Sequence, residues 1–397
     1  MAEMFDVVII GGGASGLFLA SQLPKGLSAA IIEGGERVGK KLLATGNGKC
    51  NLTNLDMRAE RYNNPSAVAE FLDEFDAHDA IVAFEKMGLI TKSVDGRIYP
   101  FSECASTVLD VLRRAVAKNG ARILTSHIAE KVTKEDGIFY ISGSAKEDGT
   151  TKAFDVAAKN VVLATGSPAT FGRDGAGLYI ALGHTARSLT PSLVPVKTER
   201  GRIKGLQGVR VKAGVSIGDR REIGEVLFKD FGVSGIAAFN ASSEIARGRA
   251  KVGDILSIDF MTGFSLAEVE EILRRRDADM TVGELMTGTF HTRLQERIID
   301  IAGCNAEDKA APNISALARA IKNFELKIEG LGNTSLAQVM SGGLNVDEFD
   351  KNLMSKKVAG AYAIGEALDI DGDCGGYNLQ WAWSSAHAVA NALEKRN

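Results

Sequence analysis

The sequence has little proline, few cysteines and no long apolar run. Only 7 of its 397 residues are proline and 4 are cysteine, with no C-x-x-C spacing. This argues against a disulfide framework and against a cysteine-ligated zinc site. There is no stretch of about 20 consecutive apolar residues and no basic leader segment. We therefore expect a cytoplasmic protein without a membrane span.

The sequence also lacks a strong excess of charge of either sign. The formal net charge is −3, so no bulk attraction to nucleic acid or to acidic membranes follows. The five histidines show no metal-ligand spacing, and we expect no metal site. Glycine, in contrast, is abundant at 44 residues. Many glycines beside few prolines favour tight turns and close approach of the backbone to a ligand.

The first glycine cluster follows a short apolar segment near the start of the chain. Residues 6–20 read DVVIIGGGASGLFLA, in which an apolar strand at 7–10 runs into Gly11, Gly13 and Gly16 and then into a helix. In this G-x-G-x-x-G spacing, the first glycine allows a tight turn, the second lets the backbone approach a pyrophosphate, and the third lets helix and strand pack closely. The pattern predicts a dinucleotide site at the start of the helix.

An acidic residue stands where such a site needs one. Glu33 closes a second apolar strand at 29–32, 20 residues after Gly13, and a carboxylate there binds the ribose hydroxyls. Residues 34–54 then form a long loop rich in glycine and amide side chains, which suits a ligand larger than NAD. Lys40 and Lys41 in this loop are candidates for contacts with the diphosphate or a flavin edge; the alternative is a solvated surface pair.

The rest of the chain falls into three zones. Strand and helix patterns alternate up to about residue 190, which favours a parallel sheet with crossover helices. Short β-rich runs separated by turns fill 193–260 and predict a small antiparallel sheet or barrel. Capping-box patterns at Ser265 and Thr281 open helices in the following segment, and residues 324–330 look like a strand that returns to the β insert. A strand at 361–364 and a helix at 379–394 close the chain.

These zones predict an α/β protein. Its Rossmann-like nucleotide-binding domain, with a parallel sheet, is built from both chain ends. The expected domains are the nucleotide-binding domain from residues 1–190 and 340–397, an inserted β-barrel-like domain from 191–262 and 322–339, and a helical subdomain from 263–321.

Five segments resemble a known family of proteins. They read GGGASGL from Gly11, TGNGKCNLTN from Thr45, ATGSPA from Ala164, MSGGL from Met340 and GEALDIDGDCGGYNLQWAW from Gly365. The sequence resembles the HI0933-like flavoproteins (YhiN- and BaiN-type), within the glutathione-reductase-like group of FAD/NAD(P)-binding enzymes. One departure is Lys49, where the family usually has arginine; lysine keeps the charge and loses the planar fork.

The resemblance implies an extended, non-covalently bound FAD and assigns roles to many residues. Glu33 would bind the adenosine ribose, and the resemblance places Ala14 and Ser15 at the diphosphate. The loop of Thr45, Gly46 and Asn47 would lie against the isoalloxazine, Ala129 would contact adenine through its backbone, and Glu366 would lie near the ribityl chain. The pyrimidine edge would meet Asn378 and Leu379. The cofactor-binding set is completed by Thr165, Gly166 and Gly365.

The placement of Asn378 and Leu379 has a physical reason. They open the last helix, whose positive end would stabilise the negative charge that reduced flavin gathers at N1 and the C2 carbonyl. The alternative for Asn378 is a helix cap alone.

The function implied is that of an FAD-dependent oxidoreductase that transfers hydride through flavin N5, with NAD(P)H as the expected reductant. The catalytic acid and base are unknown, and a redox disulfide of Cys50 or Cys374 is not expected. Family members are associated with small amines or ketones, with steroid-like bile acids, and with uridine in ribosomal RNA. A small-molecule substrate is the main expectation. RNA is an alternative partner that would need a basic surface, with candidates at Arg247, Arg249, Lys251 and residues 274–276. A non-catalytic flavin-binding redox sensor is a third interpretation.

Overall fold

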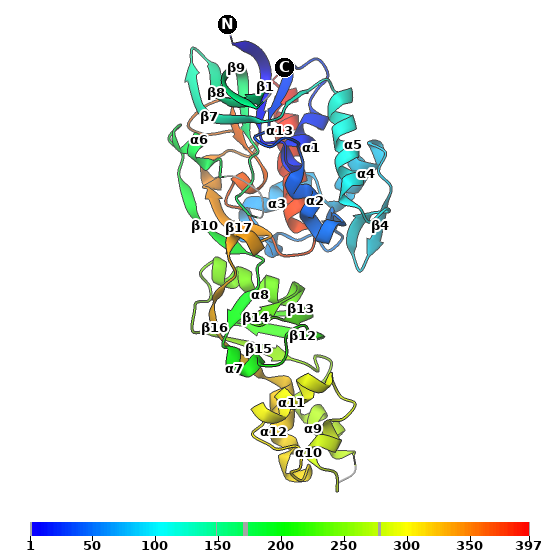
Figure 1. Ribbon diagram of the computed structural model, residues 1–397. Coiled ribbons are helices and arrows are strands. Elements are labelled where there is room, and N and C mark those ends of the chain that lie inside the picture. The colour runs from blue at the N-terminus through cyan, green and yellow to red at the C-terminus, as the bar shows by residue number, and fades with distance from the viewer. Residues whose placement is uncertain (1, 148, 170–173, 277–278, 397) are drawn as a thin grey trace. The chain divides into compact units, whose positions relative to one another are not determined.

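The computed structural model describes residues 2–147, 149–169, 174–276 and 279–396 (Figure 1). The chain folds into two compact units. The first unit contains the described residues up to Thr190 and those from Gln338 onward, and the second runs from Pro191 to Ala337. Both chain ends therefore belong to one unit, as the predicted fold class requires.

A mixed sheet forms the centre of the first unit. In the described part of the chain its strands follow the order β6-β2-β1-β9-β8-β7, and β18 pairs with β9. The strands β6, β2, β1, β9 and β18 run parallel, while β7, β8 and β9 are joined as an antiparallel meander. Their bounds are β1 (Glu3–Ile10), β2 (Ala29–Ile32), β6 (Arg122–Leu124), β7 (His127–Glu135), β8 (Ile138–Glu147), β9 (Thr150–Leu163) and β18 (Ala361–Ala363).

The parallel part of the sheet is buried on both faces. Val7, Val8 and Ile9 of β1 have no exposed surface, and neither does Val162 of β9. Continuous apolar runs of this kind are what a parallel strand covered by helices on both sides requires. The predicted parallel sheet is confirmed, whereas the antiparallel β7–β8 extension was not predicted.

The helices of the first unit bring the two ends of the chain into one core. Helix α1 (Ala14–Gln22) packs against α5 (Ala105–Lys118) and against the last helix, α13 (Tyr377–Glu394). The ring of Phe18 in α1 lies with its centroid 5.2 Å from that of Trp383 in α13. The rings of Phe75 and Phe84 also lie within 6 Å of Phe18. The other helices of this unit are α2 (Lys40–Ala44), α3 (Pro65–Glu74), α4 (Ala77–Lys86) and α6 (Ala176–Ile180).

Two smaller sheets join distant segments of the chain. One has the order β3 (Thr53–Asn54), β5 (Arg97–Pro100) and β4 (Thr91–Val94), and the other pairs β10 (Ala186–Ser192) with β17 (Val339–Leu344). In β17 a Cβ at Gly342 would lie only 2.5 Å from the carbonyl oxygen of Ser188. Gly342 of the MSGGL segment is therefore needed because β10 approaches it at backbone distance.

The second unit contains a closed antiparallel barrel. Its strand order is β11-β14-β13-β12-β15-β16, with β16 closing against β11. Along β16 the buried residues Phe324, Leu326 and Ile328 alternate with more exposed ones, which is the pattern of a strand with one face in a core. The predicted barrel and its returning strand are confirmed. The bounds are β11 (Val196–Thr198), β12 (Arg210–Ile217), β13 (Arg220–Phe228), β14 (Gly232–Ser234), β15 (Ile255–Asp259) and β16 (Phe324–Leu331).

The helices of the second unit include a group inserted between β15 and β16. Ser265 and Thr281 both form the predicted capping boxes: each side chain accepts a hydrogen bond from the backbone three residues on, and the glutamate there accepts one in return. Leu273 and Leu317 of this group pack into the same apolar core as the barrel. The helices are α7 (Arg200–Ile203), α8 (Ile236–Ala246), α9 (Leu266–Arg274), α10 (Val282–Met286), α11 (Thr292–Ile301) and α12 (Ile314–Lys322).

Two kinds of feature are absent from the residues that the structure describes. None of their helices combines the length and the apolar character needed to span a bilayer. Nor do three or more His, Cys, Asp or Glu side chains gather in a group able to hold a metal ion.

Candidate functional site

The turn between β1 and α1 has the geometry of a dinucleotide-binding loop. Gly11 has φ +116°, and a Cβ there would overlap the carbonyl oxygen of Ala164 at the end of β9. A Cβ at Gly16 would overlap the carbonyl oxygen of Gly11, so this glycine lets the helix pack onto the strand. Gly13, in contrast, faces open space, with no atom within 4 Å of where its Cβ would be. The turn thus leaves room for a ligand in front of Gly13.

The start of α1 is free to meet an anion. Gly13 is its N-cap and provides no side-chain cap, and Ala14 and Ser15 form its first turn. The first backbone N–H groups of a helix have no partner within the helix and carry partial positive charge. Open space and unsatisfied donors at the same place fit a diphosphate group.

Glu33 holds the loops around this turn. Its Oε2 accepts a hydrogen bond of 2.9 Å from the backbone N–H of Gly12, and its Oε1 accepts one of 2.7 Å from Gly35. The backbone N–H of His127, at the start of β7, donates to the Glu33 carbonyl oxygen. Each carboxylate oxygen can accept a further hydrogen bond. The side chain is therefore fixed beside the glycine turn with acceptor capacity left for ribose hydroxyls.

Ala129 lies two residues after His127 on β7. It pairs with Gly143 of β8, directly before a register shift that continues at Lys131. A Cβ at Gly143 would overlap the carbonyl oxygen of Ile128, so the bulge depends on this glycine. The structure brings the β7 segment to Glu33, and the predicted backbone contact of Ala129 with adenine stays a prediction.

Lys41, Ser167 and Glu366 come together from three parts of the chain. Lys41 Nζ lies 2.5 Å from Glu366 Oε2 and 3.2 Å from Ser167 Oγ, and Ser167 Oγ donates to Glu366 Oε2 at 2.8 Å. The neighbouring Lys40 is exposed at the surface. The two adjacent lysines of the sequence therefore have different environments.

The residues beside this cluster are those predicted from the ends of β9 and β18. Gly166 and Gly365 both have positive φ, +68° and +61°, and a Cβ at Gly365 would lie 2.9 Å from Ser15 Oγ. The hydroxyl of Thr165 is buried and has no hydrogen-bond partner among the residues that the structure describes. This hydroxyl packs against Gly175, where a Cβ would lie only 2.4 Å from it.

The predicted flavin loop is a left-handed turn held by its own backbone. Thr45 to Gly48 form one turn of 3-10 helix in which Gly46 and Asn47 have φ of +57° and +55°. The carbonyl oxygen of Thr45 accepts the N–H of Cys50, and the Thr45 hydroxyl donates to Leu42. The Nε1 of Trp383 donates to the Leu52 carbonyl oxygen at 2.9 Å. Helix α13 thereby fixes the end of this loop.

Two glycines precede helix α13 and lie close to other parts of the chain. Gly375 and Gly376 have φ of +131° and +104°, and a Cβ at Gly376 would lie 2.6 Å from the backbone of Thr53. No side chain caps the helix. The Asn378 side chain instead accepts the N–H of Gly372 and donates to the Gly372 carbonyl oxygen. The amide of Asn378 thus holds the preceding loop, and the backbone contacts of Asn378 and Leu379 with the flavin stay a prediction.

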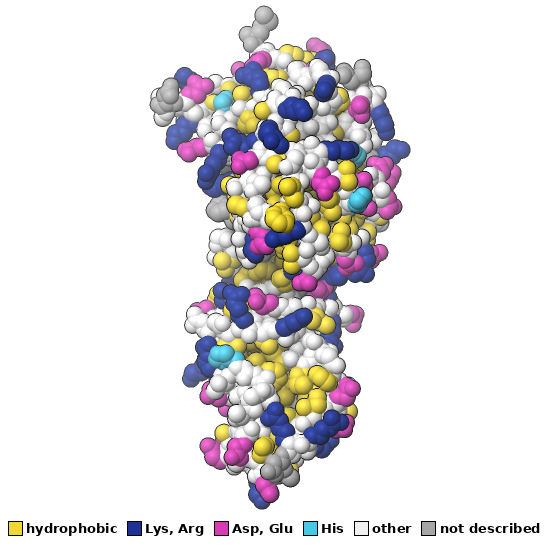
Figure 2. All heavy atoms as spheres, turned by 90° about the vertical axis from the view of Figure 1, so that its right-hand side faces the viewer, with side chains coloured by type: hydrophobic (Ala, Val, Ile, Leu, Met, Phe, Trp, Pro, Cys, Tyr) yellow, Lys and Arg dark blue, Asp and Glu magenta, His cyan; other side chains and the backbone are white. Residues whose placement is uncertain are grey.

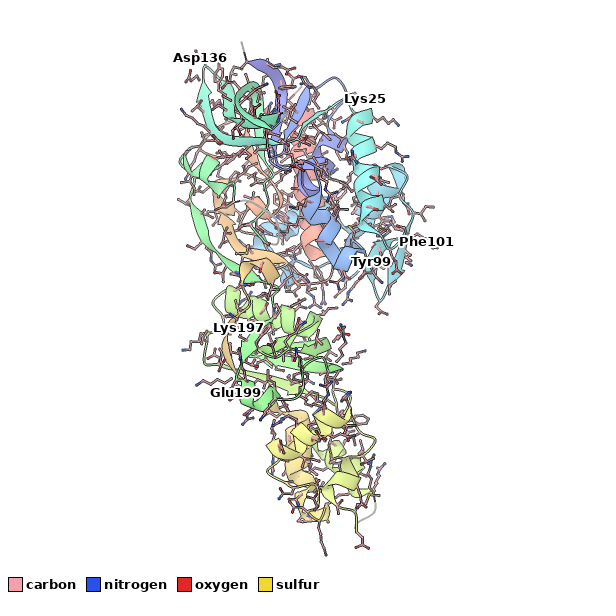
Figure 3. The ribbon with its side chains drawn as sticks, viewed as in Figure 1. Lys25, Tyr99, Phe101, Asp136, Lys197 and Glu199 are labelled. Atoms are coloured by element: carbon pink, nitrogen blue, oxygen red, sulfur yellow. The ribbon has the colours of Figure 1, made fainter. Side chains whose placement is uncertain are left out.

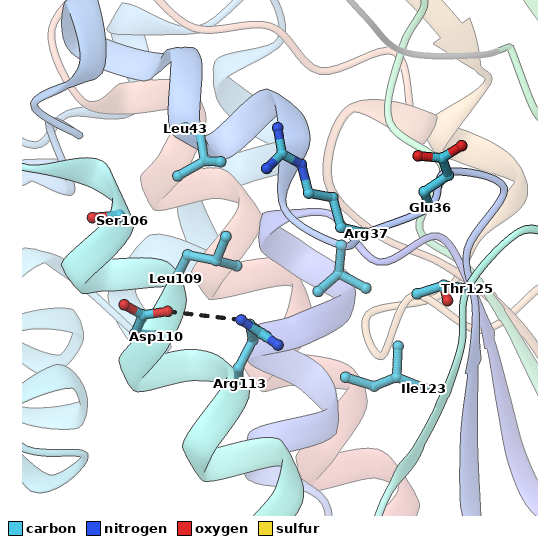
Figure 4. A pocket seen from close by; sticks show the side chains of 10 residues that line it. Glu36, Arg37, Leu43, Ser106, Leu109, Asp110, Arg113, Ile123 and Thr125 are labelled. Carbon is cyan, nitrogen blue, oxygen red and sulfur yellow. Dashed lines mark ion pairs between the residues drawn. The ribbon is translucent and has the colours of Figure 1, made fainter.

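A cleft of about 600 Å³ opens between the segment that follows Glu33 and helix α5 (Figure 4). Its apolar wall includes Val38 and Leu109, and Val38 also lies against Gly12, as Glu33 does. Arg113, on α5, forms an ion pair of 3.8 Å with Asp110 at its rim. The cleft thus adjoins the loop that carries Glu33. Its lining is Glu36, Arg37, Val38, Leu43, Ser106, Leu109, Asp110, Arg113, Ile123 and Thr125.

The thiols of Cys50 and Cys374, which lie in the predicted flavin-binding segments, have low reactivity. Burial raises the pKa of Cys50 to about 12 and that of Cys374 to about 11. None of the four cysteines, all of which the structure describes, forms a disulfide. A thiol must ionise to react, so these two are poor nucleophiles in the folded protein.

Lys49, the departure from the family pattern, lies at the surface. Its Nζ is 2.6 Å from Glu103, which also binds Lys92 at 2.6 Å. Hydrogen bonds from Lys49 and Lys92 lower the pKa of Glu103 to about 2. Lys92 lies in turn over the ring of Phe101, which projects at the edge of the small sheet (Figure 3). A single ammonium satisfies this contact, so the planar fork of arginine is not needed here.

The geometry fits a dinucleotide of the FAD type. A glycine turn with open space at Gly13, a fixed carboxylate at Glu33, a buried unsatisfied hydroxyl at Thr165 and an uncapped helix at the far end of the chain all belong to one unit. These features define a Rossmann-type dinucleotide-binding protein in which the C-terminal helix belongs to the same unit as the glycine turn.

Comparison with known proteins gives the family. A family model described as "HI0933-like protein Rossmann domain" matches residues 5–392. The chain therefore belongs to the HI0933-like family and is an FAD-dependent oxidoreductase, as the resemblance predicted.

Relatives cover the whole chain. It is 33% identical to a 3-dehydro-bile acid delta(4,6)-reductase of Clostridium scindens, over 99% of this chain and 100% of that one. It is 27% identical to a ribosomal RNA dihydrouridine synthase of Haemophilus influenzae, over 100% of both chains. Among solved structures, a 3-ketosteroid-Δ4-(5α)-dehydrogenase of Rhodococcus jostii RHA1 matches with a TM-score of 0.52 and 16% identity, over 98% of this chain and 97% of that one. The last likeness shows the fold alone.

Sequence reasoning missed three residues that the site uses. Gly12 and Gly35 donate the hydrogen bonds that hold Glu33, and Ser167 bridges Lys41 and Glu366. A signal existed for the two glycines, because a carboxylate beside a glycine turn needs donors at short range. For Ser167 the signal was its place in the ATGSPA segment, while its partners lie 126 and 199 residues away and leave no local pattern.

Proposed function

We propose that this protein uses NAD(P)H and FAD to reduce a carbon–carbon double bond conjugated to a ketone in a steroid-like or other small molecule. The observation that carries this proposal is the relative from Clostridium scindens, a bile acid reductase that aligns over nearly the whole chain. Hydride from NAD(P)H supplies two electrons and one proton, and solvent supplies the second proton. Bound FAD would supply hydride transfer at N5.

The residues of the first unit have roles in this proposal that follow from their contacts. Glu33 would hold the adenosine ribose, and the open space at Gly13 would admit the diphosphate. The first backbone N–H groups of α13, at Asn378 and Leu379, would stabilise negative charge at the pyrimidine edge. Asn378 supports this arrangement through the two hydrogen bonds with which its side chain fixes Gly372.

Reduction of uridine in ribosomal RNA is the second candidate. It is favoured by the full-length relative from Haemophilus influenzae. Part of the predicted basic surface, however, is internally paired. Arg274 and Arg275 form ion pairs of 2.5 and 2.6 Å with glutamates one helical turn away, and Arg276 donates to the Leu285 carbonyl oxygen. On the face that Figure 2 shows, basic and acidic side chains are interspersed. Strong phosphate binding needs cations that are not already neutralised.

The test is reduction and reoxidation of the purified FAD-bound protein without oxygen. NADH and NADPH are mixed with it separately in a stopped-flow instrument, and flavin absorbance is followed. The reduced protein is then mixed with a 3-keto-Δ4 steroid, with a uridine-containing ribosomal RNA fragment, or with buffer. We expect NADH or NADPH to bleach the flavin rapidly and the steroid to restore its colour.

Each other result decides against this proposal in a different way. Reoxidation by the RNA fragment alone, with binding that weakens steeply as salt rises, would establish the second candidate. Reduction without reoxidation by either substrate would favour the redox-sensor interpretation. Protein that takes up no FAD would overturn all three.

A further inference from the structure

The cluster of Lys41, Ser167 and Glu366 joins three segments that lie 126 and 199 residues apart in the sequence. Lys41 is in α2, Ser167 follows β9, and Glu366 follows β18. Lys41 and Glu366 are partly buried, with 25% and 16% of their side chains exposed, and Ser167 is 2% exposed. The serine hydroxyl donates to the carboxylate and accepts from the ammonium group. The three side chains therefore hold one another in place.

This cluster adjoins the glycine turn. Gly365, next to Glu366, would place a Cβ 2.9 Å from Ser15 Oγ in the first turn of α1. Gly166, next to Ser167, would place one 3.9 Å from Glu366 Oε2. The segment that carries Glu366 thus packs against the helix start where the proposed function places the diphosphate, and the carboxylate lies beside Gly166.

An uncompensated carboxylate in that position would be unfavourable for an anionic ligand. Two like charges a few ångströms apart repel strongly when water is partly excluded. Glu366 is nevertheless useful there, since its oxygens can accept hydrogen bonds from the hydroxyls of a ribityl chain. A cation fixed beside the carboxylate removes the repulsion and leaves the acceptor function.

We propose that Lys41 is a positioning residue that compensates the charge of Glu366, so that this carboxylate and the diphosphate of FAD can occupy the same site. Ser167 fixes the ammonium and carboxylate groups relative to each other. The inference rests on the proposed function, because it takes the ligand to be FAD bound with its diphosphate at the glycine turn.

The test is a double-mutant cycle read by flavin binding. Dissociation constants of FAD and of riboflavin, which has no phosphate, are measured by flavin fluorescence for the wild type, Lys41→Met, Glu366→Gln and the double variant. We expect Lys41→Met to weaken FAD binding by about tenfold or more, because it leaves a carboxylate without its counter-ion. Riboflavin binding should change much less. Adding Glu366→Gln to Lys41→Met should restore most of the FAD affinity.

Further variants separate charge compensation from a general loss of structure. Lys41→Arg keeps the charge and should retain most of the affinity, and Lys40→Met should weaken FAD far less than Lys41→Met. Lys25→Met, at an exposed position (Figure 3), removes one positive charge elsewhere and is the matched control. Thermal unfolding of each variant checks the fold.

Three results would overturn the inference. Lys41→Met could weaken FAD and riboflavin equally, the double variant could bind FAD as weakly as Lys41→Met, or Lys41→Met could bind FAD as tightly as the wild type. In each case wild-type protein still binds FAD and the proposed function stands. Wild-type protein that binds no flavin would instead overturn the proposed function and this inference with it.

Discussion

His184 lies with its Nδ1 2.9 Å from Oε2 of Glu348 and with its Nε2 2.8 Å from Oγ of Ser355. The Ser355 oxygen also accepts the backbone N–H groups of Lys357 and Val358. Its remaining hydrogen therefore points to Nε2, and the neutral ring with a proton on Nδ1 satisfies every group. The Nε2 position has no acceptor for a second proton. This network joins the segment after α6 to the segment before β18.

Because of this histidine, the free energy of unfolding of the first unit should decrease as the pH is lowered. Burial lowers the pKa of His184, although Glu348 acts in the opposite direction. Burial also acts to raise the pKa of Glu348, but hydrogen bonds from Lys357, Thr185 and His184 lower it to about 2, so this carboxylate stays ionised. The unfolded chain binds the proton more readily than the folded one. The contribution is therefore present above about pH 6.5 and is lost as the pH falls through the lowered value.

The measurement is urea unfolding from pH 7.5 to 5 followed by tryptophan fluorescence. Both tryptophans, Trp381 and Trp383, lie in α13, so the signal reports the first unit alone. His184→Gln should cost about 1–3 kcal/mol at pH 7.5, as expected for losing a partner in a buried hydrogen-bond network. It should also reduce the pH slope. Some slope should remain, because burial lowers the pKa of His387 as well. An unchanged slope in His184→Gln, with exposed His78→Gln as the control, would contradict the assignment.

Substitution by alanine should lower stability at Gly11 and lower FAD affinity, without a loss of stability, at Gly13. Gly11→Ala introduces a Cβ at φ +116° that overlaps the Ala164 carbonyl oxygen, so we expect a loss of stability of about 2 kcal/mol or more. Gly13→Ala meets no atom within 4 Å and should change stability by less than about 0.5 kcal/mol. Its added methyl group would nevertheless occupy the space proposed for the diphosphate. Gly13→Ala should therefore weaken FAD binding in a protein of normal stability. Equal loss of stability in both variants would show that the open space at Gly13 is misassigned.

The parts of the site that the sequence predicts are those set by short-range pattern. The turn at Gly11–Gly16 and the carboxylate at Glu33 belong to one βαβ unit, in which spacing along the chain determines position in space. The α13 segment was recognised because its glycines and its helix are adjacent. The predicted bounds of segments with such local patterns are close to the observed ones. The last helix, for example, is predicted at 379–394 and begins at Tyr377.

The parts that sequence could not give depend on contacts between distant residues. Lys40 and Lys41 are equivalent in sequence, and only the packing of α2 turns one of them toward Glu366. The sequence allows Asn378 to cap α13. Only the course of the preceding loop shows that its side chain instead forms hydrogen bonds with the backbone of Gly372. The strands β7 and β8 were missed because their pairing depends on a bulge at Ala129 and on Gly143.

Glu33 should contribute to the binding of FAD and not to the binding of FMN. FMN has no adenosine ribose, so only FAD can use a carboxylate at that position. Glu33→Ala also leaves the N–H groups of Gly12 and Gly35 without their acceptor. We expect FAD affinity to fall by about tenfold or more, in line with the loss of a charged hydrogen-bond partner. FMN affinity, measured in the same fluorescence titration, should change much less. A parallel loss for both flavins would mean that Glu33 acts only by holding the loop.

Cys104 should be the first thiol to react with an alkylating reagent. It is exposed at the start of α5, where hydrogen bonds from the side chain and backbone of Ser106 lower its pKa. Burial instead raises the pKa of Cys50, Cys374 and Cys304. A larger thiolate fraction and free access both favour reaction at Cys104. Limiting iodoacetamide at pH 7.5 followed by peptide mass spectrometry should find the label there. In Cys104→Ser the two buried thiols, Cys50 and Cys304, should react only after unfolding in urea. Labelling of Cys374 as fast as Cys104 in the native protein would contradict the order that the two pKa shifts predict.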